Sequence, residues 1–309
     1  MLNKNYKRIA PNTLVLVACL TVAGYCIGQD YSKDLPEIPG TFIDVGTHRL
    51  HHRCVGSGAP TVVIDNGIAG SATEWYEIQD LLSVEYRACV YDRAGYAWSE
   101  PGPAPRTTEQ ISDELVALLV NSNEPGPFVF VGHSFGGFTA LRMATVMPDR
   151  VAGLVLVDSS SPGVSFEHLE GEKDIVNPIA MGAASGNDKV PSTPQEMARF
   201  LNSRRKALFV QMDEIANFEV SAQQVSDTSG IKNLPILVVA RDSEVRPESP
   251  ASHSAREDAW RKAQVKLSEI STRGELLIAT GSDHFIHLRK PEWLAASIQS
   301  FLKGLNDTQ

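Results

Sequence analysis

The segment from Gly132 to Gly136 (GHSFG) holds a serine between two glycines, directly after the apolar run Phe128–Val131. A helical pattern, Thr139 to Met147, follows it. In so sharp a turn between strand and helix, glycines avoid the clash of a Cβ and the serine hydroxyl is exposed. The N–H of Phe135, at the start of the helix, would point to where an oxyanion forms. Ser134 is therefore the candidate nucleophile.

A serine hydroxyl is a poor nucleophile at neutral pH and needs a base to take its proton. His284 lies in a loop after the apolar run Leu276–Ala279, 150 residues beyond Ser134, and is the candidate base. His287 competes with it, but stands where the chain turns helical and is more typical of a packing or surface histidine.

Short runs rich in β-branched residues alternate with helical patterns along most of the chain. The first two runs, joined by Gly46-Thr47, predict a hairpin, and the later continuous apolar runs are typical of parallel strands buried on both faces. This alternation predicts an α/β fold with one mostly parallel sheet. The expected strands are Thr41–Val45, Arg49–Val55, Thr61–Asp65, Ala88–Asp92, Phe128–Val131, Gly153–Asp158, Ile236–Ala240 and Leu276–Ala279.

The clearest expected helix spans Thr108 to Val120, where Thr107 and Gln110 predict a capping box. A second feature is a stretch of 75 residues without a strand pattern, residues 159–233. It contains two expected helices, Gln195–Val210 and Met212–Ser221. An insertion of this length in a compact domain is usually functional, and we therefore expect a helical lid after the sixth strand. The alternative is an insertion without a function.

The amino-acid composition argues against some classes of function. The chain has 309 residues, with 28 Lys and Arg against 37 Asp and Glu, a formal net charge of -9. That acidic balance argues against a nucleic-acid partner held by phosphate neutralisation. Four cysteines, Cys19, Cys26, Cys54 and Cys89, show no zinc-ligand spacing, and neither a metal nor a cofactor is implied.

Residues 1–28 differ in kind from the rest. A basic lead with Lys4, Lys7 and Arg8 precedes an uncharged apolar run, Thr13 to Gly28. This layout indicates a signal peptide, with an uncleaved membrane anchor and a lipoprotein signal at Cys19 as alternatives. We therefore expect an exported protein, periplasmic, secreted or membrane-anchored, in which residues 29–40 form a linker.

The motifs together resemble those of α/β-hydrolase superfamily serine hydrolases, over Thr41 to Leu305. Asp92 to Ser99 (DRAGYAWS) is similar to the family's D-R-x-G-x-G-x-S loop, with Ala97 in place of the second glycine. Asp65 to Ile68 (DNGI) occupies the place of the His-Gly-x oxyanion turn, and Trp75 matches a common tryptophan. The resemblance implies an eight-stranded sheet flanked by helices, with residues 41–158 and 234–305 as the core and 159–233 as the lid. It also implies the backbone N–H of Ile68 as the second oxyanion donor.

A carboxylate must orient the histidine, and the family's order along the chain is nucleophile, acid, histidine. Asp158 ends the strand after the nucleophile helix, where haloalkane dehalogenases of the superfamily carry their acid. Most members place it after the next strand, where Asp242 and Glu244 stand in an irregular version of the pattern. That irregularity favours Asp158 and leaves Asp242 and Glu244 as alternatives.

Two further expectations follow from the resemblance. Arg93 and Asp92 are interpreted as structural, bracing the turn near the nucleophile by charge-assisted bonds to backbone. The strands that carry Cys54 and Cys89 would be neighbours, so the pair is either a disulfide or two buried thiols.

The hypothesis is a hydrolase that cleaves carboxylic esters of a small molecule through an acyl-enzyme. Its catalytic residues would be Ser134, His284 and Asp158, with oxyanion donors Ile68 and Phe135. A proline iminopeptidase-like aminopeptidase, using acidic residues between Glu167 and Asp174, or another amide or acyl-transfer activity, is the alternative. A non-catalytic ligand-binding homologue is a third reading, because a fold alone does not fix function. The substrate and the oligomeric state are not encoded in any readable pattern.

Overall fold

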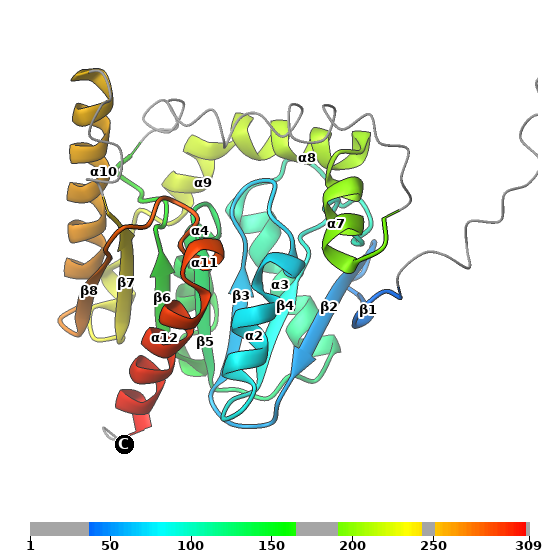
Figure 1. Ribbon diagram of the computed structural model, residues 1–309, viewed down its shortest axis with the longest axis horizontal. Coiled ribbons are helices and arrows are strands. Elements are labelled where there is room, and N and C mark those ends of the chain that lie inside the picture. Colours follow the sequence, from blue (N-terminus) through cyan, green and yellow to red (C-terminus); the bar gives the residue numbers. More distant parts are fainter. Residues whose placement is uncertain (1–36, 165–190, 243–250, 307–309) are drawn as a thin grey trace, which may run out of the picture. The chain divides into compact units, whose positions relative to one another are not determined.

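The computed structural model describes residues 37–164, 191–242 and 251–306 (Figure 1). The expected signal or anchor segment, residues 1–28, lies outside them, as do residues 29–36 of the linker and 165–190 of the insertion. Within the described residues, no helix is both long and apolar enough to cross a membrane.

Eight strands form one sheet, as the sequence predicts, in the order β1-β2-β4-β3-β5-β6-β7-β8. Only the β1/β2 and β2/β4 pairs are antiparallel, and the remaining neighbours run parallel. The central strands are buried on both faces, which explains their continuous apolar runs. The strands are β1 Thr41–Asp44, β2 Arg49–Val55, β3 Thr61–Asp65, β4 Ala88–Tyr91, β5 Phe128–His133, β6 Val151–Val157, β7 Ile236–Arg241 and β8 Gly274–Ala279.

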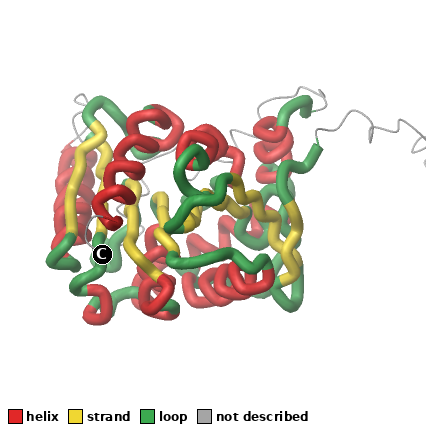
Figure 2. The backbone as a smooth tube through the Cα atoms, turned by 90° about the horizontal axis from the view of Figure 1, so that it is seen from below, coloured by secondary structure: helices red, strands yellow, loops and turns green. Residues whose placement is uncertain are grey.

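Helices cover both faces of this sheet (Figures 1 and 2). On one face α3, α4 and α10 bury Leu115, Met143 and Trp260 against it, and on the other α2 and α12 bury Ile78 and Leu302. The helices are α2 Tyr76–Leu82, α3 Thr108–Asn121, α4 Gly136–Val146, α7 Pro194–Asn202, α8 Arg205–Ala216, α9 Phe218–Gln224, α10 Ala251–Glu269, α11 Ile286–Arg289 and α12 Pro291–Asn306. Short 3-10 turns add η3 Ala72–Trp75, η4 Pro148–Arg150 and η6 Ser229–Ile231.

The N-terminus of α3 is capped by Thr107, whose side chain accepts a hydrogen bond from the Gln110 N–H. The reciprocal half of the predicted capping box is not formed, because the Thr107 N–H donates to Pro105 O (3.0 Å), while the Gln110 side-chain amide donates to Glu114. The prediction was therefore correct for the cap residue and wrong for its partner.

In the described part of the insertion, residues 159–164 and 191–233, three helices lie between β6 and β7: α7, α8 and α9. The expected single helix Gln195–Val210 is wrong: α7 ends at Asn202 and α8 begins at Arg205. The chain bends there because Arg204 adopts an extended conformation at the N-cap of α8. The break separates two helices that both contact the loops of the core, as described below.

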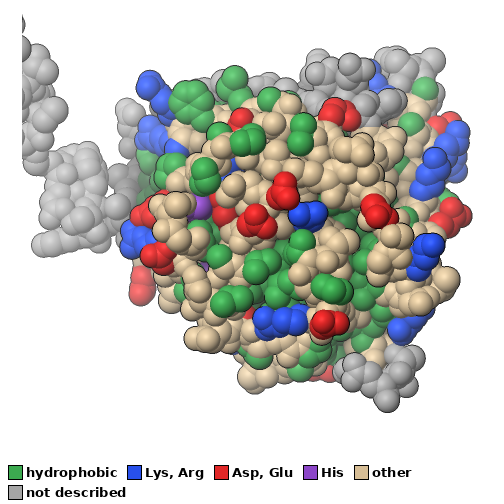
Figure 3. Space-filling view, turned by 180° about the vertical axis from the view of Figure 1, so that it is seen from behind, with side chains coloured by type: hydrophobic (Ala, Val, Ile, Leu, Met, Phe, Trp, Pro, Cys, Tyr) green, Lys and Arg blue, Asp and Glu red, His purple; other side chains and the backbone are tan. Residues whose placement is uncertain are grey.

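Charged side chains of both signs are interspersed with hydrophobic ones on the face of the molecule in Figure 3. Lys and Arg side chains are scattered over the part of this face that the structure describes, some of them beside Asp or Glu.

Candidate active site

Ser134 lies at the tip of the turn that joins β5 to α4. It has a positive φ of 51°, and its backbone N–H donates to Val157 O at the end of β6 (3.2 Å). A Cβ on Gly132 would lie 2.4 Å from Gly136 O, and one on Gly136 would lie 2.6 Å from Asp65 O. Only glycine fits at either position, so the sharp turn that the sequence predicts is formed. The serine itself is buried, with 7% of its surface exposed, which differs from the exposed hydroxyl that the sequence suggests.

His284 lies in the loop between β8 and α11, next to this turn. His133 Nε2 lies 3.0 Å from the carbonyl oxygen of His284, and the two imidazole rings are 4.7 Å apart. Burial lowers the pKa of His133 well below its ordinary value, so this ring stays neutral and can donate to that carbonyl. The residue before Ser134 therefore fixes the backbone that carries His284.

Asp158 is hydrogen-bonded to His284, with 2.6 Å between Asp158 Oδ2 and His284 Nδ1. Its other oxygen accepts from Trp260 Nε1 on α10 (2.8 Å) and from the Arg241 N–H (3.0 Å). Arg241 Nη1 lies 3.1 Å from Oδ2. Each carboxylate oxygen of Asp158 thus has two donors.

This environment keeps Asp158 ionised. Burial alone would raise its pKa, but the Arg241 guanidinium and the hydrogen bonds from His284 and Trp260 outweigh burial and hold the pKa below its ordinary value. A buried carboxylate at this place can fix the orientation and tautomer of an imidazole.

The sequence left two alternatives to Asp158 as the acid, Asp242 and Glu244. Asp242, directly after β7, accepts a hydrogen bond from the Gly281 N–H (2.8 Å) and so supports the loop that leads to His284. Glu244 lies outside the described residues. Of the candidates whose positions are described, Asp158 is the one hydrogen-bonded to His284.

The loop after β3 lies against the nucleophile turn. A Cβ on Gly67 would be 3.1 Å from Ser134 Cβ, so the residue before Ile68 packs against the serine. Arg93 donates to the carbonyl oxygens of Asn66 and Gly67, which confirms the structural role expected of this arginine. Phe135, the other expected oxyanion donor, is the N-cap residue of α4.

His287 has the packing role that the sequence suggested. It is buried, and its ring stacks on Trp75 at 4.5 Å with an interplanar angle of 4°. Asp92 is likewise structural: it lies 2.8 Å from His51 Nδ1 and accepts a hydrogen bond from the Ala72 N–H.

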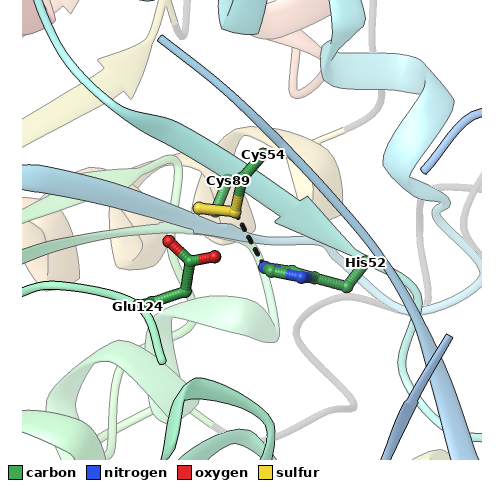
Figure 4. A group of neighbouring side chains, drawn as sticks. All are labelled: His52, Cys54, Cys89 and Glu124. Atoms are coloured by element: carbon green, nitrogen blue, oxygen red, sulfur yellow. Dashed lines mark hydrogen bonds between the residues drawn. A yellow bond between two sulfur atoms is a disulfide. The ribbon is translucent and has the colours of Figure 1, made fainter. Parts of the chain in front are cut away.

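One cluster outside this site contains metal-ligating residue types: His52, Cys54, Cys89 and Glu124, with candidate ligand atoms within 4.8 Å of one another (Figure 4). Cys54 and Cys89 face each other across β2 and β4 and form a disulfide, one of the two alternatives left by the sequence. Burial lowers the pKa of His52 to about 4, and Glu124 pairs with Arg87. With the sulfurs bonded to each other, the cluster lacks the thiolates that a zinc site uses.

Three residues near the site were not found by sequence reasoning. Trp260 and Arg241 hold Asp158, and Glu214 on α8 pairs with Arg93 at 2.9 Å. A weak signal existed for Trp260, since a buried indole N–H usually finds an acceptor. Nothing local marks Glu214, because its partner lies 121 residues away.

Comparisons with known proteins show the family to which this chain belongs. A family model described as alpha/beta hydrolase fold matches residues 60–220, more than half of the chain. A putative carbamate hydrolase, RutD, from Pseudomonas syringae pv. syringae (strain B728a) is 26% identical over 223 residues, 66% of this chain and 83% of that protein. Lipase LipV from Mycobacterium tuberculosis is 37% identical over 119 residues, 38% of this chain and 43% of that protein.

The chain thus spans less than half of the lipase and most of the carbamate hydrolase relative. Among solved structures, a thermophilic esterase from Thermogutta terrifontis superposes with a TM-score of 0.60 at 20% identity, covering 86% of this chain and 98% of that one. At that identity the likeness concerns the fold, and it agrees with the eight-stranded sheet and its flanking helices. The chain belongs to the α/β-hydrolase family of enzymes.

Proposed function

We propose that this hydrolase cleaves carboxylic esters of a small molecule through an acyl-enzyme intermediate, with Ser134 as nucleophile. The observation that carries the proposal is the 2.6 Å hydrogen bond between Asp158 and His284, beside a serine on a strained strand-to-helix turn. A nucleophile, a base and a group that orients the base are the three parts such chemistry needs.

Acylation begins when Ser134 Oγ attacks the ester carbonyl carbon and its proton passes to Nε2 of His284, since Nδ1 is engaged by Asp158. The carbonyl oxygen becomes an oxyanion held by the N–H groups of Ile68 and Phe135. Collapse of this tetrahedral species breaks the bond to the alcohol, which leaves with the proton from His284. An ester between the acyl group and Ser134 remains.

Deacylation repeats these steps with water. His284 takes a proton from water as its oxygen attacks the acyl carbon, and the second tetrahedral species expels Ser134 Oγ, which regains a proton from His284. The carboxylic acid is released and the serine restored. Throughout, the ionised Asp158 stabilises the imidazolium that forms twice per turnover.

The test uses a series of p-nitrophenyl esters and a fluorophosphonate probe, which labels activated serines covalently. Ser134→Ala is expected to lose both turnover and labelling. Ser226→Ala, two residues after the end of α9, is the matched control and is expected to keep both. Persistent turnover in purified Ser134→Ala would overturn the proposal, and an unlabelled, inactive wild type would favour a ligand-binding homologue.

The same steps can open an amide or a carbamate, and the relative named as a putative carbamate hydrolase supports including these bonds in the screen. The acidic residues that an aminopeptidase would need, between Glu167 and Asp174, lie outside the described residues. A panel of aminoacyl amides and carbamates beside the esters separates these activities by kcat/KM. A higher kcat/KM for any of them than for the best ester would replace the ester assignment.

We also propose that the enzyme acts outside the cytoplasm. The basic and then apolar layout of residues 1–28 supports export, and the Cys54–Cys89 disulfide suits an oxidising compartment. Fusion of residues 1–40 to a reporter that is active only after export tests this; a reporter retained inside the cell would contradict it.

A further inference from the structure

Four backbone groups of the loop Asn66–Ala69 are held by side chains from elsewhere in the chain. Arg93 Nη2 donates to Gly67 O at 2.9 Å, and Nη1 donates to Asn66 O. The Ala69 N–H donates to the Tyr96 hydroxyl (3.2 Å), and Ala69 O accepts from Asn202 (3.0 Å). The loop is therefore fixed on both sides of Ile68.

The bond to Gly67 O has a direct consequence for Ile68. The carbonyl of Gly67 and the N–H of Ile68 belong to one peptide unit, which is planar, and in a trans unit they point in opposite directions. Fixing the carbonyl oxygen therefore fixes the direction of the N–H. Arg93 acts from the side opposite to the proposed oxyanion.

Arg93 is in turn held from the insertion. Glu214 on α8 accepts from Arg93 Nε at 2.9 Å and from Nη2 at 3.1 Å, and the side chains of Glu214 and Arg93 are 0% and 1% exposed. Glu214 also accepts from the Tyr96 hydroxyl at 2.7 Å. Burial would lower the pKa of Arg93, but Glu214 and Asp65 outweigh burial and raise it, so the guanidinium stays charged.

We propose that Glu214 is a positioning residue for the reaction: through Arg93, it fixes the peptide plane that directs the Ile68 N–H. The insertion then helps to orient one of the two proposed oxyanion donors, in addition to packing on the core. This inference rests on the proposed function, in which that N–H stabilises the transition state.

The test compares kcat and KM of Glu214→Gln with those of the wild type on a short-chain p-nitrophenyl ester. The amide cannot accept both Arg93 hydrogen bonds, so the guanidinium loses its fixed orientation. We expect kcat to fall about 10- to 100-fold, less than for loss of an oxyanion donor, with KM changed by less than about threefold. The inhibition constant of a trifluoromethyl ketone, whose adduct with the serine carries an oxyanion, should rise in parallel.

Glu114→Gln is the matched control. Glu114 forms a similar pair with Arg106 at 2.6 and 2.7 Å, with 4% and 2% of the two side chains exposed. We therefore expect Glu114→Gln to lower the unfolding temperature as Glu214→Gln does, but to leave kcat unchanged. Equal kcat values for the two variants would overturn the inference.

Glu214→Asp keeps the charge with a shorter reach, and its kcat should lie between those of the wild type and Glu214→Gln. If Glu214→Gln does not fold, Glu214→Asp decides: a wild-type kcat refutes the role, and a lowered kcat at unchanged KM supports it. Failure of the proposed function is distinguishable, because it would appear as turnover in Ser134→Ala.

Discussion

The indole of Trp260 donates a hydrogen bond to the carboxylate of Asp158, with 2.8 Å between Trp260 Nε1 and Asp158 Oδ1. This bond, made by a helix that follows β7, occupies the oxygen of Asp158 that does not face His284. With one oxygen anchored in this way, the other is held against the imidazole. The predictions below follow from this and neighbouring contacts.

The choice of acid is tested by Asp158→Asn. An amide in this position can donate to Nδ1 and stabilise the wrong tautomer of His284, so kcat is expected to fall about 10⁴-fold in an ester assay. Asp242→Asn is the control: its amide oxygen can still accept from the Gly281 N–H, and kcat should stay within about threefold of the wild type. The reverse ranking would make Asp242 the acid.

Arg241→Met tests the charge balance at Asp158 through the pH dependence of stability. The pKa of Asp158 is lower in the folded protein than in the unfolded chain. Asp158 therefore stabilises the wild type fully at a pH above its unfolded-state pKa, and this stabilisation is lost as pH falls through the folded-state pKa. Without Arg241 the buried carboxylate loses its cation, at a cost of about 3 kcal/mol near pH 7.

Protonation of Asp158 removes that penalty, so the stability gap between Arg241→Met and the wild type should narrow as pH falls below about 5. Thermal unfolding from pH 7 to pH 3 measures it. In an Asp158→Asn background the narrowing should be smaller, because Arg241 then keeps only its ion pair with Glu257 (2.8 Å) of these two carboxylate contacts. A gap that stays constant with pH in the Asp158 protein would show that the charge pair contributes little.

Gly67→Ala probes the contact between the loop after β3 and the serine. The new Cβ would lie 3.0 Å from His133 Nδ1 and 3.1 Å from Ser134 Cβ, closer than ordinary packing allows. We expect kcat to fall about tenfold with a modest loss of stability, of about 1 kcal/mol. Gly230→Ala, where a Cβ meets nothing within 4 Å, is the control; similar losses in both variants would point to a general effect of the substitution.

The double variant Cys54→Ser and Cys89→Ser tests the disulfide. The bond closes a loop with a sequence separation of 35, and its removal should lower the free energy of unfolding by about 3 to 4 kcal/mol. Denaturant unfolding with and without a reductant measures this. Below the unfolding transition kcat should be unchanged, since the disulfide joins β2 and β4, whereas Ser134 and His284 follow β5 and β8. A lowered kcat would reveal coupling between the two regions.

The sequence by itself located the strands and pointed to Ser134 and His284 as candidates for the site. The apolar runs place all eight strands to within two residues of their observed ends, because burial on both faces of a sheet requires such runs. The glycines around Ser134 identify its turn, because the lack of space for a Cβ in a sharp turn is a local requirement that shows within a few residues of sequence. Asp158 could be favoured over Asp242 but not separated from it, as both follow strand ends.

Tertiary structure decided what depends on contacts between distant segments. β6 pairs with β7, and the Asp158 N–H donates to Val239 O at 2.7 Å, which brings the carboxylate within reach of Arg241 and Trp260. Likewise the sequence showed a glutamate within a helix at position 214, and only packing against Arg93 made it a buried counter-ion. Ion pairs between distant segments cannot be recognised in the sequence, because the helix or strand that contains each partner forms the same hydrophobic pattern whether or not the other partner is present.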